Sequence, residues 1–198
     1  MLAASLIYKP PNWIDPFDWP AVFGNQHPIE IELGCGKGAF LLWAAQTHPD
    51  RNFVGVDRQL ARLNKADKKA QRLCLDNVRL VRIEASYFIG KLVPERSVDV
   101  VHIYFPDPWP KRRHLKHRLF KTEFVTDLHK TLRNGGAVNV ATDDPDYFAH
   151  IETVMLQGAQ FTKAAPEHLP EEATTEFERI FRAGGKPIYR SRYLRQDQ

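Results

Sequence analysis

The sequence predicts an α/β fold, namely a mostly parallel seven-stranded sheet with helices on both faces and a C-terminal antiparallel strand. From residue 29 onward, short apolar runs alternate with longer segments of helical spacing, which is typical of βαβ units. Glycine and acidic residues stand at the ends of the first apolar runs, where doubly wound sheets bind ligands. Two last apolar runs flank a loop and a short helix, which indicates a terminal strand pair.

Each expected element follows from a local pattern. Residues 1–27, rich in proline and tryptophan, predict an N-terminal surface arm, and residues 28–198 a single core domain. Apolar runs predict parallel strands at 29–33, 53–57, 78–84, 98–105 and 137–143. Helical spacing predicts helices at 38–48, 60–75, 87–92 and 120–132. Asp144 as N-cap and Pro145 in the first turn start a helix that runs to about residue 157. The strand pair is expected at 161–165 and 188–194, with a short helix within 174–185.

Composition narrows the class of protein. The 198 residues are 43% apolar and 26% charged, as in one globular domain. We expect a cytoplasmic protein without a membrane span, because the apolar runs are short and the N-terminus lacks signal-peptide features. Two cysteines without a C-x-x-C pair predict neither a disulfide framework nor a metal site. The net charge of +4 is concentrated in 58–82, 111–118 and 179–195, which favours a polyanionic partner.

A glycine-rich turn follows the first strand, in "ELGCGKGAF". Gly34 and its neighbours allow a close backbone approach to a cofactor, but the spacing also fits the loose dinucleotide form G-x-G-x-x-A. Glu32 favours S-adenosylmethionine, because a carboxylate there can hold the cationic α-amino group of a methionine moiety. The alternative is a buried acid paired with a lysine such as Lys37.

Two further acids end the next strands. Asp57 can bond the ribose hydroxyls of either cofactor class. Glu84 lies near the expected adenine, where its carboxylate could accept from the exocyclic amine; it can equally be a solvated charge at the end of a strand.

The segment "YFPDPWPKRRHLKHRLF" (104–120) combines three prolines with a basic run. The prolines predict a stiff, non-helical loop that carries Asp107 and Trp109. Seven basic or titratable residues without an acid follow in 111–118, and they favour phosphate binding over a merely solvated face. Trp109 either stacks on an RNA base or braces the loop.

Several of these motifs together resemble the bacterial tRNA (guanine-N(7)-)-methyltransferase family. They are "EIELGCGKG", "FVGVD", "FPDPWPKRRHLKHRL", "ATDDPDY" and "TEFERIFRAGGKPIYR", in the family order from about residue 29 to 195. The resemblance implies a Rossmann-like class I methyltransferase. Its reaction would move a methyl group from S-adenosylmethionine to N7 of a guanosine in the variable loop of tRNA, usually guanosine 46.

By motif, the resemblance also implies roles for single residues. Glu32, Asp57, Glu84 and Asp107 resemble cofactor contacts, and Asp107 is also the implied catalytic residue. The implied substrate-binding residues are Lys111, Asp143, Thr175, Glu176, Phe177 and Glu178. The implied RNA-contacting segment is Arg113, His114, Leu115, Lys116, His117 and Arg118. Thr175 and Glu178 also have the spacing of a helix capping box, and this local function is compatible with substrate binding.

The chemistry agrees with these residues. Guanine N7 carries a lone pair and no proton, so transfer needs positioning and electrostatics rather than a general base. Asp107 could stabilise the positive charge on the purine and Asp143 could accept from the guanine edge; which acid does which stays open. Three alternatives are a methyltransferase for a small molecule or a protein, an RNA-binding module without catalysis, and a nicotinamide oxidoreductase. The basic loop disfavours the first, the acids at the strand ends the second, and Glu32 the third.

Overall fold

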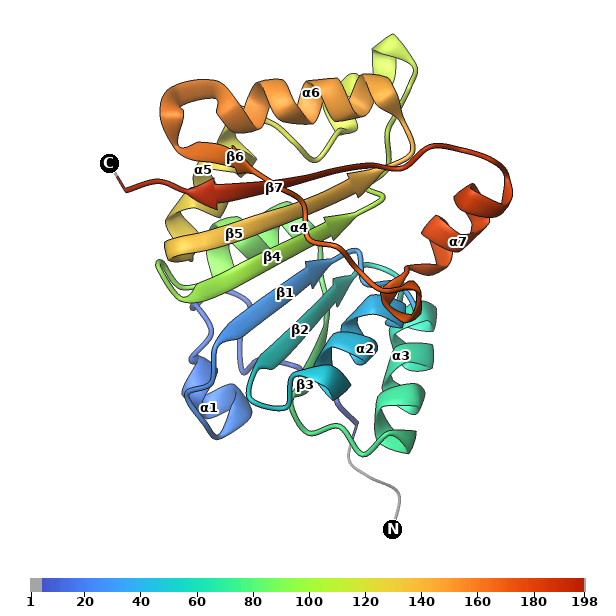
Figure 1. Cartoon of the computed structure of the whole chain (residues 1–198). Helices are drawn as coiled ribbons and strands as arrows, with labels where there is room; N and C mark the ends of the chain where they lie inside the picture. Colours follow the sequence, from blue (N-terminus) through green and yellow to red (C-terminus); the bar gives the residue numbers. More distant parts are fainter. Residues whose placement is uncertain (1–4, 198) are drawn as a thin grey trace.

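A seven-stranded sheet lies at the centre of the protein, in the order β3-β2-β1-β4-β5-β7-β6 (Figure 1). The computed structural model describes residues 5–197, without the side chain of Arg112, so residues 1–4 of the expected arm and residue 198 lie outside the description. Neighbouring strands from β3 to β5 are parallel, whereas β7 runs antiparallel to both β5 and β6. The strands are β1 (Ile29–Leu33), β2 (Asn52–Asp57), β3 (Val78–Arg82), β4 (Val98–Tyr104), β5 (Leu132–Thr142), β6 (Phe161–Ala164) and β7 (Tyr189–Arg195). This order confirms the predicted class.

Helices cover both faces of the sheet (Figure 1). One apolar layer lies under α2 and α3, and a second lies under α4, η1, α5 and α6. The helices are α1 (Trp19–Phe23), α2 (Ala39–Thr47), α3 (Leu60–Arg72), α4 (Ala85–Tyr87), η1 (Phe88–Leu92), η2 (Arg112–His117), α5 (Thr122–Thr131), α6 (Pro145–Leu156), η3 (Gln157–Ala159), η4 (Glu171–Ala173) and α7 (Glu176–Ala183). The strand order reverses between β1 and β4, so a ligand crevice is expected at their carboxyl ends.

Most predicted boundaries agree with the structure, and the exceptions have local causes. The carboxylate of Asp144 accepts a hydrogen bond from Tyr147 N at 2.8 Å, which confirms the predicted cap of α6. β5 begins at Leu132 rather than 137, because a register shift lets this residue pair with Val98 before the regular ladder. The short helix expected at 87–92 is α4 followed by the π-helical turn η1.

The N-terminal segment is only in part the expected surface arm: residues 11–16 are exposed, but other residues pack onto the sheet. Ile7 bridges to Leu80 of β3, and Phe17, Trp19 and Val22 are buried in the core. The indole Nε1 of Trp19 donates to Ser97 Oγ at 2.9 Å, so this ring also satisfies its polar atom. The sequence did not predict these contacts, because proline-rich composition does not reveal that these apolar side chains cover the sheet.

No helix among the described residues has the length and apolar character needed to span a membrane. In the same part of the chain, His, Cys, Asp and Glu side chains do not gather in threes that could hold a metal ion.

Candidate active site

A tight glycine turn connects β1 to α2 at the carboxyl edge of the sheet. Gly34 and Gly36 have φ angles of 78° and 56°, a region that favours glycine. Asp57, at the end of β2, accepts hydrogen bonds from Gly36 N at 3.1 Å and from Gln59 N at 2.7 Å. This carboxylate therefore holds the turn in place, in addition to its expected cofactor contact.

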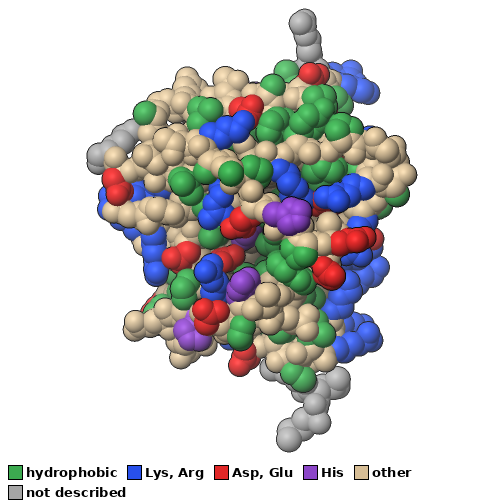
Figure 2. Space-filling view, viewed as in Figure 1, with side chains coloured by type: hydrophobic (Ala, Val, Ile, Leu, Met, Phe, Trp, Pro, Cys, Tyr) green, Lys and Arg blue, Asp and Glu red, His purple; other side chains and the backbone are tan. Residues whose placement is uncertain are grey.

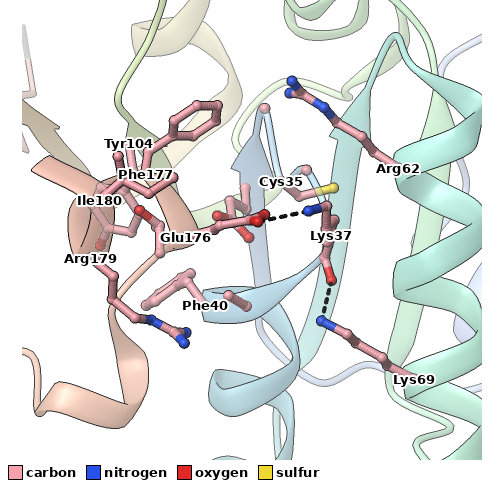
Figure 3. A pocket seen from close by; sticks show the side chains of 15 residues that line it. Cys35, Lys37, Phe40, Arg62, Lys69, Tyr104, Glu176, Phe177, Arg179 and Ile180 are labelled. Atoms are coloured by element: carbon pink, nitrogen blue, oxygen red, sulfur yellow. Dashed lines mark hydrogen bonds and ion pairs between the residues drawn. The ribbon is translucent and has the colours of Figure 1, made fainter.

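A pocket of about 480 Å³ opens beside this turn (Figure 3). Phe40 and Tyr104 supply aromatic walls from α2 and β4. Side chains of α7 line the facing wall, among them Phe177 and Ile180. The pocket thus lies between the glycine turn and a helix from the far end of the sequence.

Glu32 is the buried acid of this pocket, with 3% of its surface exposed. Burial, with a smaller contribution from the nearby Asp57, raises the pKa of its carboxyl to about 8. Its Oε2 has no hydrogen-bond partner among the described residues. The alternative pairing with Lys37 is absent, because Lys37 Nζ contacts Glu176 at 2.7 Å instead. A buried carboxylate oxygen without a partner suits a cationic ligand group.

The Lys37–Glu176 ion pair joins the glycine turn to α7 across the mouth of the pocket (Figure 3). The hydrogen bond from Lys37 lowers the pKa of the Glu176 carboxyl. Thr175, Glu176 and Phe177 all line the pocket, so three of the four expected α7 residues lie together there.

Glu178 lies elsewhere. Thr175 Oγ1 accepts from Glu178 N at 3.1 Å, which confirms the cap of α7. The Glu178 side chain does not return to the cap; it is 1% exposed and forms ion pairs with Arg182 and Arg190. In this structure the carboxylate therefore anchors α7 to β7, and its expected substrate contact stays a prediction.

Glu84 and Asp143, two further expected site acids, stand just after the ends of β3 and β5 and do not line the pocket. Glu84 is exposed, caps α4 by accepting from Tyr87 N at 2.8 Å, and also accepts from Ser86 Oγ at 3.0 Å. Asp143 pairs with Lys186 Nζ at 2.6 Å. Both carboxylates thus have partners within the protein: hydrogen-bond donors for Glu84 and an ion pair for Asp143.

The proline loop leaves β4 in a constrained conformation. Phe105 and Trp109 have positive φ angles of 54° and 45°, which are uncommon for residues with side chains. Arg118 is only 9% exposed; its Nε donates to Pro108 O at 2.8 Å, and its guanidinium lies 4.6 Å from the Tyr147 ring centroid. Arg118 thus braces the loop, and its expected RNA contact stays a prediction. Asp107 is exposed on this braced loop and lies outside the pocket lining.

Most of the remaining basic run faces solvent. Lys111, Arg113, Leu115, Lys116 and His117 are exposed, and His114 is half-buried. The Trp109 ring packs against His114 and His117, with centroids 5.8 and 5.2 Å away. These contacts favour the bracing function of Trp109, although 37% of its surface stays exposed.

Sequence reasoning missed a buried polar chain behind the pocket. The Tyr104 hydroxyl lies 3.0 Å from His102 Nδ1, and His102 Nε2 lies 2.8 Å from Glu30 Oε2. Arg51 completes the chain at Glu30. The available signal was a histidine within the apolar run of β4, two residues from Tyr104 and therefore on the same face.

Residues 26–191 match a protein family described as "Putative methyltransferase". A tRNA (guanine-N(7)-)-methyltransferase of Geobacter metallireducens is 35% identical over 193 residues, 95% of this chain and 92% of that protein. One of Thermotoga maritima is 34% identical over 191 residues, and the match spans 96% of this chain but only 61% of that protein's length.

Solved structures share the fold at low identity. The 16S rRNA methyltransferase KamB has a TM-score of 0.64 and 16% identity, with 89% of this chain and 91% of that chain covered. TrmN from Thermus thermophilus has a TM-score of 0.61 and 20% identity, with 90% of this chain and 47% of that chain covered. A Haemonchus contortus phosphoethanolamine N-methyltransferase, solved with S-adenosyl-L-methionine, has a TM-score of 0.56 and 12% identity, with 89% of this chain and 50% of that chain covered.

Proposed function

The chain belongs to the tRNA (guanine-N(7)-)-methyltransferase family, and on this premise we propose that it methylates N7 of a guanosine in tRNA. The methyl donor is S-adenosylmethionine, and the target is guanosine 46 of the variable loop. The reaction takes place in the cytoplasm. Membership in the family supports the reaction class, and the buried Glu32 is the observation on this chain that carries the proposal.

Glu32 fits the amino group of the methyl donor. Its Oε2 lacks a partner and lies in a pocket beside a glycine turn, so an ammonium group there would satisfy the carboxylate. The donor supplies a sulfonium methyl group when it is bound. Gly34 leaves space for a close approach, since nothing lies within 4 Å of where a Cβ would stand. Asp57 and Glu84 supply further acceptors at the next two strand ends.

Asp107 is the proposed catalytic residue. Guanine N7 has an in-plane lone pair, so the protein must position the base and stabilise the charge that develops on it. A carboxylate on the proline loop suits this task because Arg118 ties the loop to α6 through the Tyr147 ring. Lys111, Asp143, Thr175, Glu176 and Phe177 are proposed to surround the nucleoside.

The exposed part of the basic run is proposed to bind the tRNA backbone. The residues are Arg113, His114, Leu115, Lys116 and His117. Cationic side chains beside an exposed acid fit a polyanion that must bring one base to Asp107.

The test uses labelled S-adenosylmethionine and an unmodified tRNA transcript, followed by chemical cleavage at 7-methylguanosine. We expect label in the tRNA and cleavage at position 46. A transcript with adenosine at this position is the matched control and should take up no label. Label at another base atom, or none with the unaltered transcript, would refute the proposed function.

A further inference from the structure

The helix α3 places its cations and its acid on different sides. Leu63, Ala66 and Ala70 are buried against the sheet. Asp67, the acid of this helix, also faces inward: it accepts from Ser5 Oγ at 2.9 Å and from Leu6 N at 2.8 Å. The outer side of α3 is therefore left without a negative charge of its own.

Five cations occupy this outer side, and we call them the α3 basic face. Lys65, Lys68, Lys69 and Arg72 are exposed and Arg62 is half-buried. They stand three or four residues apart along the helix, where like charges repel each other. Among the described residues, no ion pair is found for Lys65, Lys68 or Arg72. Figure 2 shows Lys and Arg side chains gathered at the lower right, where Figure 1 draws α3. An arrangement that is unfavourable for the helix itself is expected where a polyanion binds.

A groove of about 430 Å³ adjoins this face. Trp43 of α2 and Leu73 form apolar parts of its lining. Lys69, Arg72 and Arg179 contribute three cations to the lining, against the single acid Glu172. A ring beside several cations is the combination by which proteins hold nucleotides in single-stranded or looped RNA.

The groove is continuous with the rim of the candidate active site. Ala39, Lys69 and Arg179 line both the groove and the Glu32 pocket. The exposed Arg58 stands just before α3, after the strand that ends in Asp57. A strand of RNA on α3 would thus pass directly beside the place where the target base is expected.

We propose that the α3 basic face and this groove bind the sugar–phosphate backbone of tRNA at a second place, separate from the run 113–117. The inference rests on the proposed function for the identity of the polyanion. Charge complementarity supports RNA over a protein partner, because the face combines five cations with an aromatic groove and leads to the active site. The run 113–117 follows β4, whereas α3 follows β2, so the two surfaces lie on different segments of the carboxyl edge.

The test is a double substitution, Lys65→Gln with Lys68→Gln, on the full chain. Neither residue lines the pocket or the groove, and both are exposed, so folding and cofactor affinity should stay unchanged. The matched control is Lys91→Gln with Lys130→Gln, two exposed lysines on η1 and α5 of the other helical layer. The measurement is tRNA affinity by filter binding across a series of salt concentrations, without any methyl transfer.

We expect the α3 variant to bind tRNA about tenfold more weakly at low salt. Two lost phosphate contacts should also flatten the plot of log affinity against log salt by about 1.4 to 1.8. In a separate methylation assay, the KM for tRNA should rise with kcat unchanged. The control should match the wild type. Equal affinity and slope in the α3 variant and the wild type would overturn the inference and favour an acidic protein as the partner of this face. A wild type that binds tRNA without methylating it would refute the proposed function but not this inference.

Discussion

Replacing Glu32 with glutamine tests whether burial of this side chain in the pocket disfavours its ionised form and so destabilises the folded protein. The carboxyl is 3% exposed, and burial raises its pKa from the ordinary 4.5 to about 8. Between pH 4.5 and about pH 8 the unfolded chain binds fewer protons than the folded one, so the free energy of unfolding falls as the pH rises. At pH 7, which is 2.5 pH units above 4.5, the raised pKa of Glu32 lowers the free energy of unfolding by about 3 kcal/mol. Near pH 4 this destabilisation vanishes.

Glu32→Gln should therefore raise the free energy of unfolding by about 3 kcal/mol at pH 7 and change it little at pH 4. The assay is urea denaturation at both pH values. The same variant should bind S-adenosylmethionine about 10- to 100-fold more weakly, because it loses a charged partner. A stability difference equal at both pH values, or a loss at pH 7, would refute the reasoning.

Glu30→Gln is the matched control on the same strand and face. Burial tends to raise the pKa of Glu30, but hydrogen bonds and charges from His102 and Arg51 outweigh this and lower the pKa to about 2. The lowered pKa means that ionised Glu30 stabilises the folded protein. This stabilisation is present above pH 4.5 and is lost as the pH falls towards 2. The control should therefore lose about 3 kcal/mol at pH 7, opposite in sign to Glu32→Gln. Equal signs for the two variants would contradict the assignment of distinct environments.

Four further substitutions separate the functions of Asp107, Lys116, Arg118 and Glu178. Asp107→Ala should lower kcat by about 100-fold or more while tRNA retention on filters stays near the wild type; weaker retention with intact kcat would contradict its catalytic assignment. Arg118→Ala should lower the melting temperature through loss of its contacts with the loop and α6, whereas Lys116→Ala should weaken tRNA binding at an unchanged melting temperature; the reverse pattern would exclude the bracing function. Glu178→Ala should reduce stability by about 1 to 3 kcal/mol in a denaturant titration, because two arginines lose their acid, and an unchanged midpoint would show that the anchor contributes nothing.

The sequence allowed the strands, the glycine turn and the caps of α6 and α7 to be predicted because these depend on residues close together in the chain. Asp144 caps through Tyr147, and Thr175 through Glu178, each three residues away. Hydrophobic periodicity likewise reflects one strand or helix at a time. Local patterns therefore predicted both the architecture and the edge at which the site lies.

The partners of charged residues could not be predicted in the same way. Lys37 was assigned to Glu32 as an alternative, yet its partner Glu176 lies 139 residues along the chain. Arg118 looks like part of a basic run, and only the packing of α6 shows that Tyr147 covers its guanidinium. Glu178 fits a capping box, whereas its carboxylate pairs with Arg190 on β7. In each case tertiary packing decides between a surface charge and a structural contact.

The most direct measurement of the proposed reaction uses two tRNAs that differ in one atom of one base. In the first, position 46 is guanosine; in the second it is 7-deazaguanosine, whose C–H at position 7 has no lone pair to accept a methyl group. With labelled S-adenosylmethionine, we expect full label in the first tRNA, none in the second, and equal retention of both. Equal label in the two tRNAs would contradict methyl transfer to N7.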